Sequence, residues 1–278
     1  YQSSGDGGTI WSPTTPSQAG LVDRHHNFRA KIVDRAGNSA YTNILAVTID
    51  TTPPSSKAVI SGVGDDVGMN RGIVAASGTT DDSTPTISGT LSAALGTGER
   101  LQIFNGTTVL GDATVNNTAL SWTFTPAGLA NTAATTYTLS AKVVDLAGNF
   151  GSASASRGFV LDTIAPLSSA AITSVTDNVG GIQGPLAAGA VTDDSTPSLS
   201  GTITAALATG ESLRIFNGSA LLGAAVVNNT LKTWTFTPTA LPATSGTPYV
   251  ISARVADAAG NLGTPSASVS FSLDTTPP

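Results

Sequence analysis

Apolar and small polar residues alternate with a period of two along most of this chain. The clearest runs are 84–91, 120–126 and 137–144, and each places its large apolar side chains on one face. Two further apolar stretches, 57–63 and 154–161, belong to the same series. Alternation of this kind is typical of half-buried β-strands. The pattern therefore predicts an all-β chain.

The pattern recurs at a spacing of 112 residues. The motif Asp-Thr-x-x-Pro begins at Asp50, Asp162 and Asp274, and Trp122 and Trp234 keep the same spacing. A period of this length is close to the size of a small domain, so we expect an array of units that fold independently. The expected parts are the C-terminal part of a truncated repeat at 1–50, complete repeats at 51–162 and 163–274, and the start of the next linker at 275–278.

Local signals within one copy refine the fold class. The stretch 100–104 meets Asn105-Gly106 and the chain returns as 107–114, and Asn-Gly supplies the positive φ angles of a tight hairpin turn. About seven antiparallel strands per copy predict a Greek-key sandwich. Tyr137 and Tyr249 match the tyrosine corner of such sandwiches, whose hydroxyl bonds to a crossing loop. His26 occupies this position in the partial copy, and we interpret it as a packing or surface variant.

Composition restricts the chemistry of the chain. It has no cysteine, which excludes disulfides and thiolate metal sites. Charged residues make up 11% and the net charge is −6, so nucleic acid and anionic lipid are not attracted. No apolar run approaches the roughly 20 residues of a membrane-spanning helix. We expect neither nucleic-acid binding nor membrane insertion by this segment.

Most of the 18 acidic residues recur at loop positions that the copies share. Successive loops of a sandwich alternate between its two ends, so these acids should gather at the joints between repeats. Converging carboxylates repel unless a cation compensates them, and a set of oxygen ligands alone favours Ca²⁺. The predicted calcium ligands at the second joint are Asp65, Asp81, Asp82, Asp162, Glu211, Asp257 and Asn261. Their counterparts elsewhere are Asp34, Asp50, Glu99, Asp145, Asn149, Asp177, Asp193, Asp194 and Asp274.

The same motifs also suit joints without an ion. Asp, Asn and Gly are the residues that turns prefer, so Asp-x-Ala-Gly-Asn also fits a turn capped by its own side chains. Asp-Thr-Thr-Pro-Pro also fits a stiff, extended linker. Both alternatives stay open from the residues. Calcium is favoured because three motifs are expected to converge on one joint.

The ordered set of motifs resembles the bacterial Ig-like tandem repeats of giant type I secreted surface adhesins, including the biofilm-associated protein family. The matching motifs are Thr-Asp-Asp-Ser-Thr-Pro-x-x-Ser-Gly-Thr, Ile-Phe-Asn-Gly, Trp-Thr-Phe-Thr-Pro, Asp-x-Ala-Gly-Asn and the closing Asp-Thr-x-x-Pro. The resemblance implies an elongated, extracellular stalk of Ig-like sandwiches on the bacterial cell surface, with calcium at its joints. Two positions depart from the pattern: His26 replaces the tyrosine, and Asp66 becomes Asn178 in the next copy.

Two functions follow from these observations. The first is a structural extender that stiffens on binding calcium and supports cell adhesion and biofilm formation. Its partners are the neighbouring repeats, while distal regions contact a host or abiotic surface. The alternative is a ligand-binding module that recognises glycan or protein through the loop segments 65–78 or 127–135, because loops on a rigid scaffold often carry recognition.

An enzyme is not expected. The complete copies lack His and Cys and contain no Gly-x-Ser-x-Gly elbow or phosphate-binding glycine loop. Asp81 and Asp82 are adjacent, and neighbouring side chains of an extended chain point to opposite sides. That arrangement suits ligation or turn capping better than an acid and base pair, so we assign no catalytic residue.

Overall fold

The computed structural model describes residues 1–130, 133–243 and 247–276. These residues contain strands, turns and loops but no helix, so none of them forms a helix that could cross a membrane. Asn131 and Thr132 of the predicted recognition segment 127–135, and Pro277 and Pro278 of the last linker, lie outside the described residues. The chain groups into two compact units, the first comprising 1–61, 87–124 and 139–156 and the second 62–86, 125–138 and 157–278.

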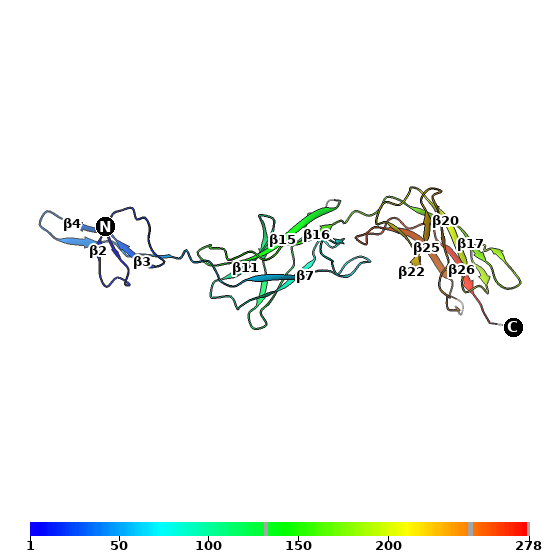
Figure 1. The fold of residues 1–278 in the computed structure, drawn as a ribbon, viewed down its shortest axis with the longest axis horizontal. Helices are drawn as coiled ribbons and strands as arrows, with labels where there is room; N and C mark the ends of the chain where they lie inside the picture. Colours follow the sequence, from blue (N-terminus) through cyan, green and yellow to red (C-terminus); the bar gives the residue numbers. More distant parts are fainter. Residues whose placement is uncertain (131–132, 244–246, 277–278) are drawn as a thin grey trace. The chain divides into compact units, whose positions relative to one another are not determined.

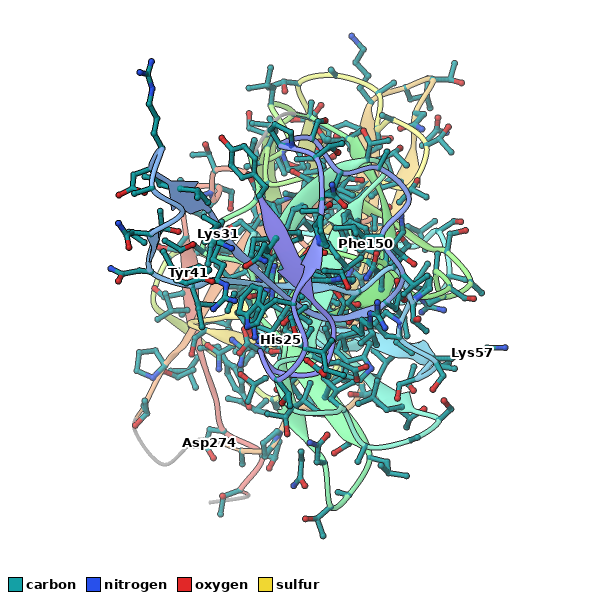
Figure 2. The ribbon with its side chains drawn as sticks, turned by 90° about the vertical axis from the view of Figure 1, so that its left-hand side faces the viewer. His25, Lys31, Tyr41, Lys57, Phe150 and Asp274 are labelled. Atoms are coloured by element: carbon teal, nitrogen blue, oxygen red, sulfur yellow. The ribbon has the colours of Figure 1, made fainter. Side chains whose placement is uncertain are left out.

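Residues 1–50 form one four-stranded sheet and one hairpin. The sheet has the order β2-β1-β3-β6, and β4 pairs with β5. Figure 2 labels Lys31 and Tyr41 on this hairpin, where the Lys31 ammonium lies 5.9 Å from the centre of the Tyr41 ring. The strands are β1 (Gln2–Ser4), β2 (Ser12–Pro13), β3 (Arg24–Arg29), β4 (Lys31–Val33), β5 (Ser39–Tyr41) and β6 (Leu45–Ile49).

Strands between residues 58 and 161 form two five-stranded sheets. Their orders are β13-β14-β10-β7-β8 and β12-β11-β15-β16-β9 (Figure 1). The strands are β7 (Ala58–Asp65), β8 (Gly72–Ile73), β9 (Thr79–Thr80), β10 (Thr86–Leu91), β11 (Arg100–Asn105), β12 (Thr108–Asp112), β13 (Thr114–Asn116), β14 (Ser121–Phe124), β15 (Thr135–Val144) and β16 (Arg157–Leu161).

The next repeat builds the same two sheets. Their orders are β18-β17-β20-β24-β23 and β19-β26-β25-β21-β22. The strands are β17 (Ala170–Asp177), β18 (Gly184–Pro185), β19 (Ala190–Thr192), β20 (Ser198–Ile203), β21 (Ser212–Asn217), β22 (Ala220–Ala224), β23 (Val226–Asn228), β24 (Thr233–Phe236), β25 (Tyr249–Ala256) and β26 (Val269–Leu273). The all-β class is therefore confirmed.

The strand count and one pairing differ from the expectation. Within the described residues each complete copy has ten strands instead of about seven, because short strands form in its long loops. One of them, β9, pairs parallel with β16, as β19 does with β26. The loop backbone finds partners there: Val160 N donates to Gly78 O at 2.8 Å and Asp162 N to Thr80 O at 2.9 Å. The sandwich is consequently not wholly antiparallel.

The tyrosine corner and the hairpin are confirmed, but the hairpin turn lies one residue later than predicted. Tyr249 Oη donates to Pro242 O at 2.6 Å, and burial raises the pKa of its hydroxyl. Tyr137 Oη donates to Ala130 O at 3.1 Å. His26 acts as the packing variant expected, since it is buried with Nε2 2.9 Å from the carbonyl oxygen of Val22. In the hairpin, Asn105 is the last residue of β11 and pairs with Thr108, so the turn residues are Gly106 and Thr107. Gly106 has a positive φ of 58°, whereas Asn105 does not have the positive φ that was predicted.

The tryptophans lie in the cores, as their strand pattern predicts. Trp122 and Trp234 are 2% and 1% exposed. Each indole covers a glycine of the neighbouring strand, Gly89 and Gly201 respectively. A Cβ on Gly201 would lie 1.9 Å from the carbonyl oxygen of Ala171 and 2.6 Å from the indole of Trp234. Close approach of backbone and indole therefore requires glycine at this position.

We expect Gly201→Ala to lower the free energy of unfolding by about 1–3 kcal/mol, since overpacking a filled core costs about that amount. Urea unfolding followed by circular dichroism and tryptophan fluorescence measures the change. Gly181→Ala is the matched control, because a Cβ there meets nothing within 4 Å. Equal stability of the two variants would show that the glycine contact is not required.

Candidate functional site

The linker residue Asp162 is tied to both of the repeats that it connects. Its backbone N–H donates to Thr80 O of β9 at 2.9 Å. Its carbonyl oxygen accepts from Asn261 Nδ2, in the Asp-x-Ala-Gly-Asn turn of the following repeat, at 2.7 Å. The same Nδ2 donates to Asp257 Oδ2 at 2.9 Å. One amide group thus connects the turn carboxylate to the linker backbone.

The earlier joint has the same arrangement. Asn149 Nδ2 donates to the carbonyl oxygen of Asp50 at 3.0 Å and to Asp145 Oδ2 at 2.8 Å. The hydrogen bond from the Asn149 side chain is the main cause that lowers the pKa of Asp145. A lowered pKa means that this carboxylate stabilises the fold above its unfolded-state pKa, and that the contribution is lost as the pH falls through the folded-state value. Asn38 lowers the pKa of Asp34 in the same way.

Several of the predicted ligands cap local turns. Asp257 Oδ1 accepts from the backbone N–H groups of Gly260 and Asn261 at 2.8 and 3.0 Å. Glu211 Oε2 accepts from Ala208 N at 2.8 Å, and Glu99 Oε2 accepts from Gly96 N at the same distance. These bonds are those of turns closed by their own side chains, which explains part of the recurrence of the acids.

Two buried aspartates, one at the end of β7 and one in the loop before β10, are also hydrogen-bonded. Asp65 is 6% exposed and its Oδ2 accepts from the Thr80 hydroxyl at 2.6 Å. Asp82 is 1% exposed and its Oδ1 accepts from Thr84 N at 2.8 Å. The next copy repeats these bonds with Thr192 donating to Asp177 at 2.5 Å and Thr196 N donating to Asp194 at 2.8 Å. Sequence reasoning missed Thr80 and Thr192, although the repeated Thr-Asp-Asp motif contains both.

Asp81 is the exception among these acids. Its Oδ1 is buried and has no hydrogen-bond partner in the described part of the chain. Burial is the main cause that raises the pKa of this carboxyl, and the charges of Asp65, Asp257 and Asp82 raise it further. A carboxylate withdrawn from water without a partner is costly, so the site favours either a proton or a cation beside it.

The backbone opposite Asp81 is shaped to receive it. A Cβ on Gly68, whose φ is +57°, would lie 1.9 Å from Asp81 Oδ2. Gly180 has the same relation to Asp193 in the next copy, with a φ of +66° and a distance of 2.1 Å. Asp193, however, is exposed, whereas Asp81 is partly covered and within the electrostatic reach of Asp257. The two aspartates therefore differ in exposure, and Asp81 also lies near a carboxylate of the following repeat, Asp257.

Three further predicted ligands line a crevice at the second joint. They are Asp162, Glu211 and Asp257, and Thr79 and Val160 also line this crevice. The structure thus sorts the acids of this joint into a crevice group and a buried group of Asp65, Asp81 and Asp82. Asn70, which sequence reasoning did not select, also contacts the joint, because its Nδ2 donates to Ala258 O at 3.1 Å.

Among the residues that the structure describes, no three His, Cys, Asp or Glu side chains are arranged to hold a metal ion together. A cation beside Asp81 would therefore need backbone, amide or water oxygens as well, which Ca²⁺ accepts. The buried Oδ1 has no hydrogen-bond partner among the described residues, and the charges of Asp65, Asp257 and Asp82 act on the same carboxyl, so a cation there would offset an existing cost.

Comparison with known proteins supports the fold. Residues 59–163 match the model of the bacterial Ig-like domain family. This match spans the two sheets built from β7 to β16. The next repeat builds the same pair of five-stranded sheets, so the two complete copies share this fold. No curated protein matches it.

Two solved structures align with most of the chain. The FN1–FN3 domains of chicken CNTN1 align at 16% identity with a TM-score of 0.40, covering 98% of this chain and 90% of that one. A 1.5-MDa bacterial ice-binding adhesin, described in connection with host cell surface retention, aligns at 18% identity with a TM-score of 0.31, covering 91% and 76%.

We expect Asp81→Asn to raise the melting temperature in the presence of a chelator, because it removes a charge that burial and three neighbouring carboxylates disfavour. A gain of a few degrees corresponds to roughly 1 kcal/mol in a domain of this size. Asp193→Asn, at the exposed counterpart, is the control and should leave the melting temperature unchanged. Differential scanning calorimetry in EDTA compares the two, and an unchanged or lower value for Asp81→Asn would contradict the assignment.

Proposed function

We propose that this chain is a structural extender, a stalk segment of a bacterial cell-surface adhesin. Its complete repeats, 51–162 and 163–274, serve as Ig-like spacers, and calcium at the joints limits their hinge motion. The match of 59–163 to a bacterial Ig-like domain supports the class of module. The recurrence of the linker bond at Asp50 and Asp162 supports a role for the joints.

The buried Oδ1 of Asp81 is the observation that carries the calcium part of this proposal. Asp81 would hold the ion, while Asp65, Asp82 and Asp257 supply the surrounding negative charge. A bound Ca²⁺ supplies positive charge that offsets their mutual repulsion. The joint would then be more stable closed than open, because the acids come from loops on both of its sides.

This proposal assigns the segment to the outside of the cell. Extracellular modules typically bind calcium at about 0.1–1 mM. Joints of that affinity would be occupied outside the cell and empty where calcium is scarce, which suits export through type I secretion as an unfolded chain. The segment would then support adhesion and biofilm formation by holding a distal adhesive region away from the surface, with no catalytic role of its own.

We expect a chelator to shorten the maximum dimension of the chain in small-angle X-ray scattering and to increase its flexibility. The physical reason is that repulsion between uncompensated carboxylates loosens the joint, which the linker bond of Asn261 to Asp162 then still holds. Added calcium should restore the longer particle in the wild type and have a smaller effect on Asp81→Asn. An unchanged maximum dimension across calcium and EDTA would count against the calcium-stiffened stalk.

The alternative, recognition of a glycan or protein by the loops, gains less support. Asn70, in the segment 65–78, donates to Ala258 of the following repeat, so part of this loop serves the joint. Trp122 and Trp234 are buried and offer no aromatic platform. Binding of the chain to a glycan array would restore this alternative.

A further inference from the structure

Two linkers lie on two turns through the same contacts, and these contacts involve no charged group of the linker. At both joints an asparagine Nδ2 donates to the backbone carbonyl of the aspartate that begins the linker, Asn149 to Asp50 and Asn261 to Asp162. The carboxylates of those aspartates are engaged elsewhere: Asp162 Oδ1 accepts from Ile164 N at 3.1 Å. The linker is therefore recognised through its backbone.

A second contact repeats beside the first. A Cβ on Gly263 would lie 2.9 Å from the carbonyl oxygen of Pro166, and a Cβ on Gly151 would lie 2.8 Å from that of Pro54. Neither glycine has the positive φ that would itself require glycine. Close approach of the linker carbonyl is the feature that both positions share, so the linker lies along the turn and the residues just after it.

We propose that the Asp-x-Ala-Gly-Asn turn, together with the glycine two residues after it, is a docking surface for the extended Asp-Thr-x-x-Pro linker of the preceding repeat. The asparagine clamps the linker carbonyl, and the glycine admits the proline carbonyl. The docking needs no cation, so it does not depend on the calcium part of the proposed function.

The turn itself explains why asparagine occupies this position. An amide nitrogen carries two protons, and Asn261 uses them on Asp257 Oδ2 and on the carbonyl oxygen of Asp162. The bond to the carboxylate is charge-assisted and fixes the direction of the amide. Gly260, with a φ of +108°, lets the turn bring the N–H of Asn261 to Asp257 Oδ1. Aspartate at position 261 would lose the donor and place a second carboxylate against the first.

The consequence for the joint is that Asp162 cannot act as a free hinge. Its N–H is bonded to β9 of one repeat and its carbonyl to the turn of the next. Rotation about this residue must break one of the two bonds. Bending of the linker is then confined to residues after Asp162 and is limited further by the contact of Pro166 with Gly263.

Pulsed electron paramagnetic resonance on the full chain tests the clamp. The chain has no cysteine, so Thr107→Cys and Ser219→Cys, at exposed positions of corresponding hairpins, would be the sole spin-label sites. In EDTA we expect Asn261→Ala to broaden the distance distribution, with the undocked population rising roughly fivefold for the loss of one hydrogen bond. An unbroadened distribution in a folded Asn261→Ala chain would overturn the proposal.

Asn229→Ala is the matched control. Asn229 also bridges two segments through its amide, because it accepts from Leu207 N at 2.8 Å and donates to Leu207 O at 3.2 Å, but both partners lie within one repeat. Its loss should leave the distance distribution unchanged. A similar broadening in this control would show that Asn261→Ala acts through general destabilisation and would also overturn the clamp.

Gly263→Ala tests the close approach of the Pro166 carbonyl to Gly263. It also provides an independent test of the docking surface if the Asn261→Ala chain does not fold. It leaves the turn hydrogen bonds in place while its Cβ meets the carbonyl oxygen of Pro166. We expect broadening in EDTA, and an unchanged distribution would contradict the docking surface. Repeating the wild-type measurement with calcium distinguishes the two proposals. A distance distribution that becomes narrower when calcium is added tests the ion site. A distribution that becomes broader in the variants in EDTA tests the clamp.

Discussion

A buried carboxylate is stabilised by a counter-charge or a proton, and at the second joint the buried Oδ1 of Asp81 has no hydrogen-bond partner among the described residues. Asp81 lies against Gly68, its Oδ1 is out of contact with water, and three other aspartates add to its electrostatic cost. Asp193, in the same backbone setting, is exposed. Burial and the charge of Asp65, in the same repeat, contribute most to the cost at Asp81, and Asp257 of the following repeat adds to it. A cation taken up at this position would convert that cost into stabilisation of the joint.

Two kinds of contact meet at the second joint: uncharged contacts to the linker backbone, and a group of aspartate carboxylates. Hydrogen bonds of Asn261 and the close approach at Gly263 hold the linker backbone through groups whose contacts do not change with calcium. The carboxylates of Asp65 and Asp82 are satisfied by hydroxyl and backbone donors. Among the aspartates of this joint that the structure describes, Asp81 has a buried Oδ1 without a hydrogen-bond partner. We infer that backbone contacts set where the linker lies, and that a cation bound beside Asp81 would set how firmly the two sides stay together.

Much of the fold could be predicted from local patterns. Alternation around Trp122 placed its indole in the core, Asn105-Gly106 marked the tight hairpin, and Tyr249 formed the expected corner. These features depend on residues close in sequence or on one face of a strand. The parallel pairing of β9 with β16 could not be predicted, because a loop that reads as irregular finds its partners on a strand distant in sequence.

The candidate site was harder to predict for a related reason. Asp81 and Asp82 are adjacent and equally recurrent, yet Asp82 Oδ1 accepts from Thr84 N at 2.8 Å, whereas the buried Oδ1 of Asp81 has no partner among the described residues. Asn70 gave no repeated signal, since its counterpart in the next copy is Ile182. Repetition identifies which acids matter to a joint, whereas their individual roles depend on how the following repeat covers them.

A crystal structure of this chain grown with calcium tests the central claim most directly. The account predicts electron density beside Asp81 Oδ1 with about seven oxygen neighbours at distances near 2.4 Å, as expected for Ca²⁺. A water molecule in that position, or a side chain hydrogen-bonded to Oδ1 with no ion nearby, would contradict it.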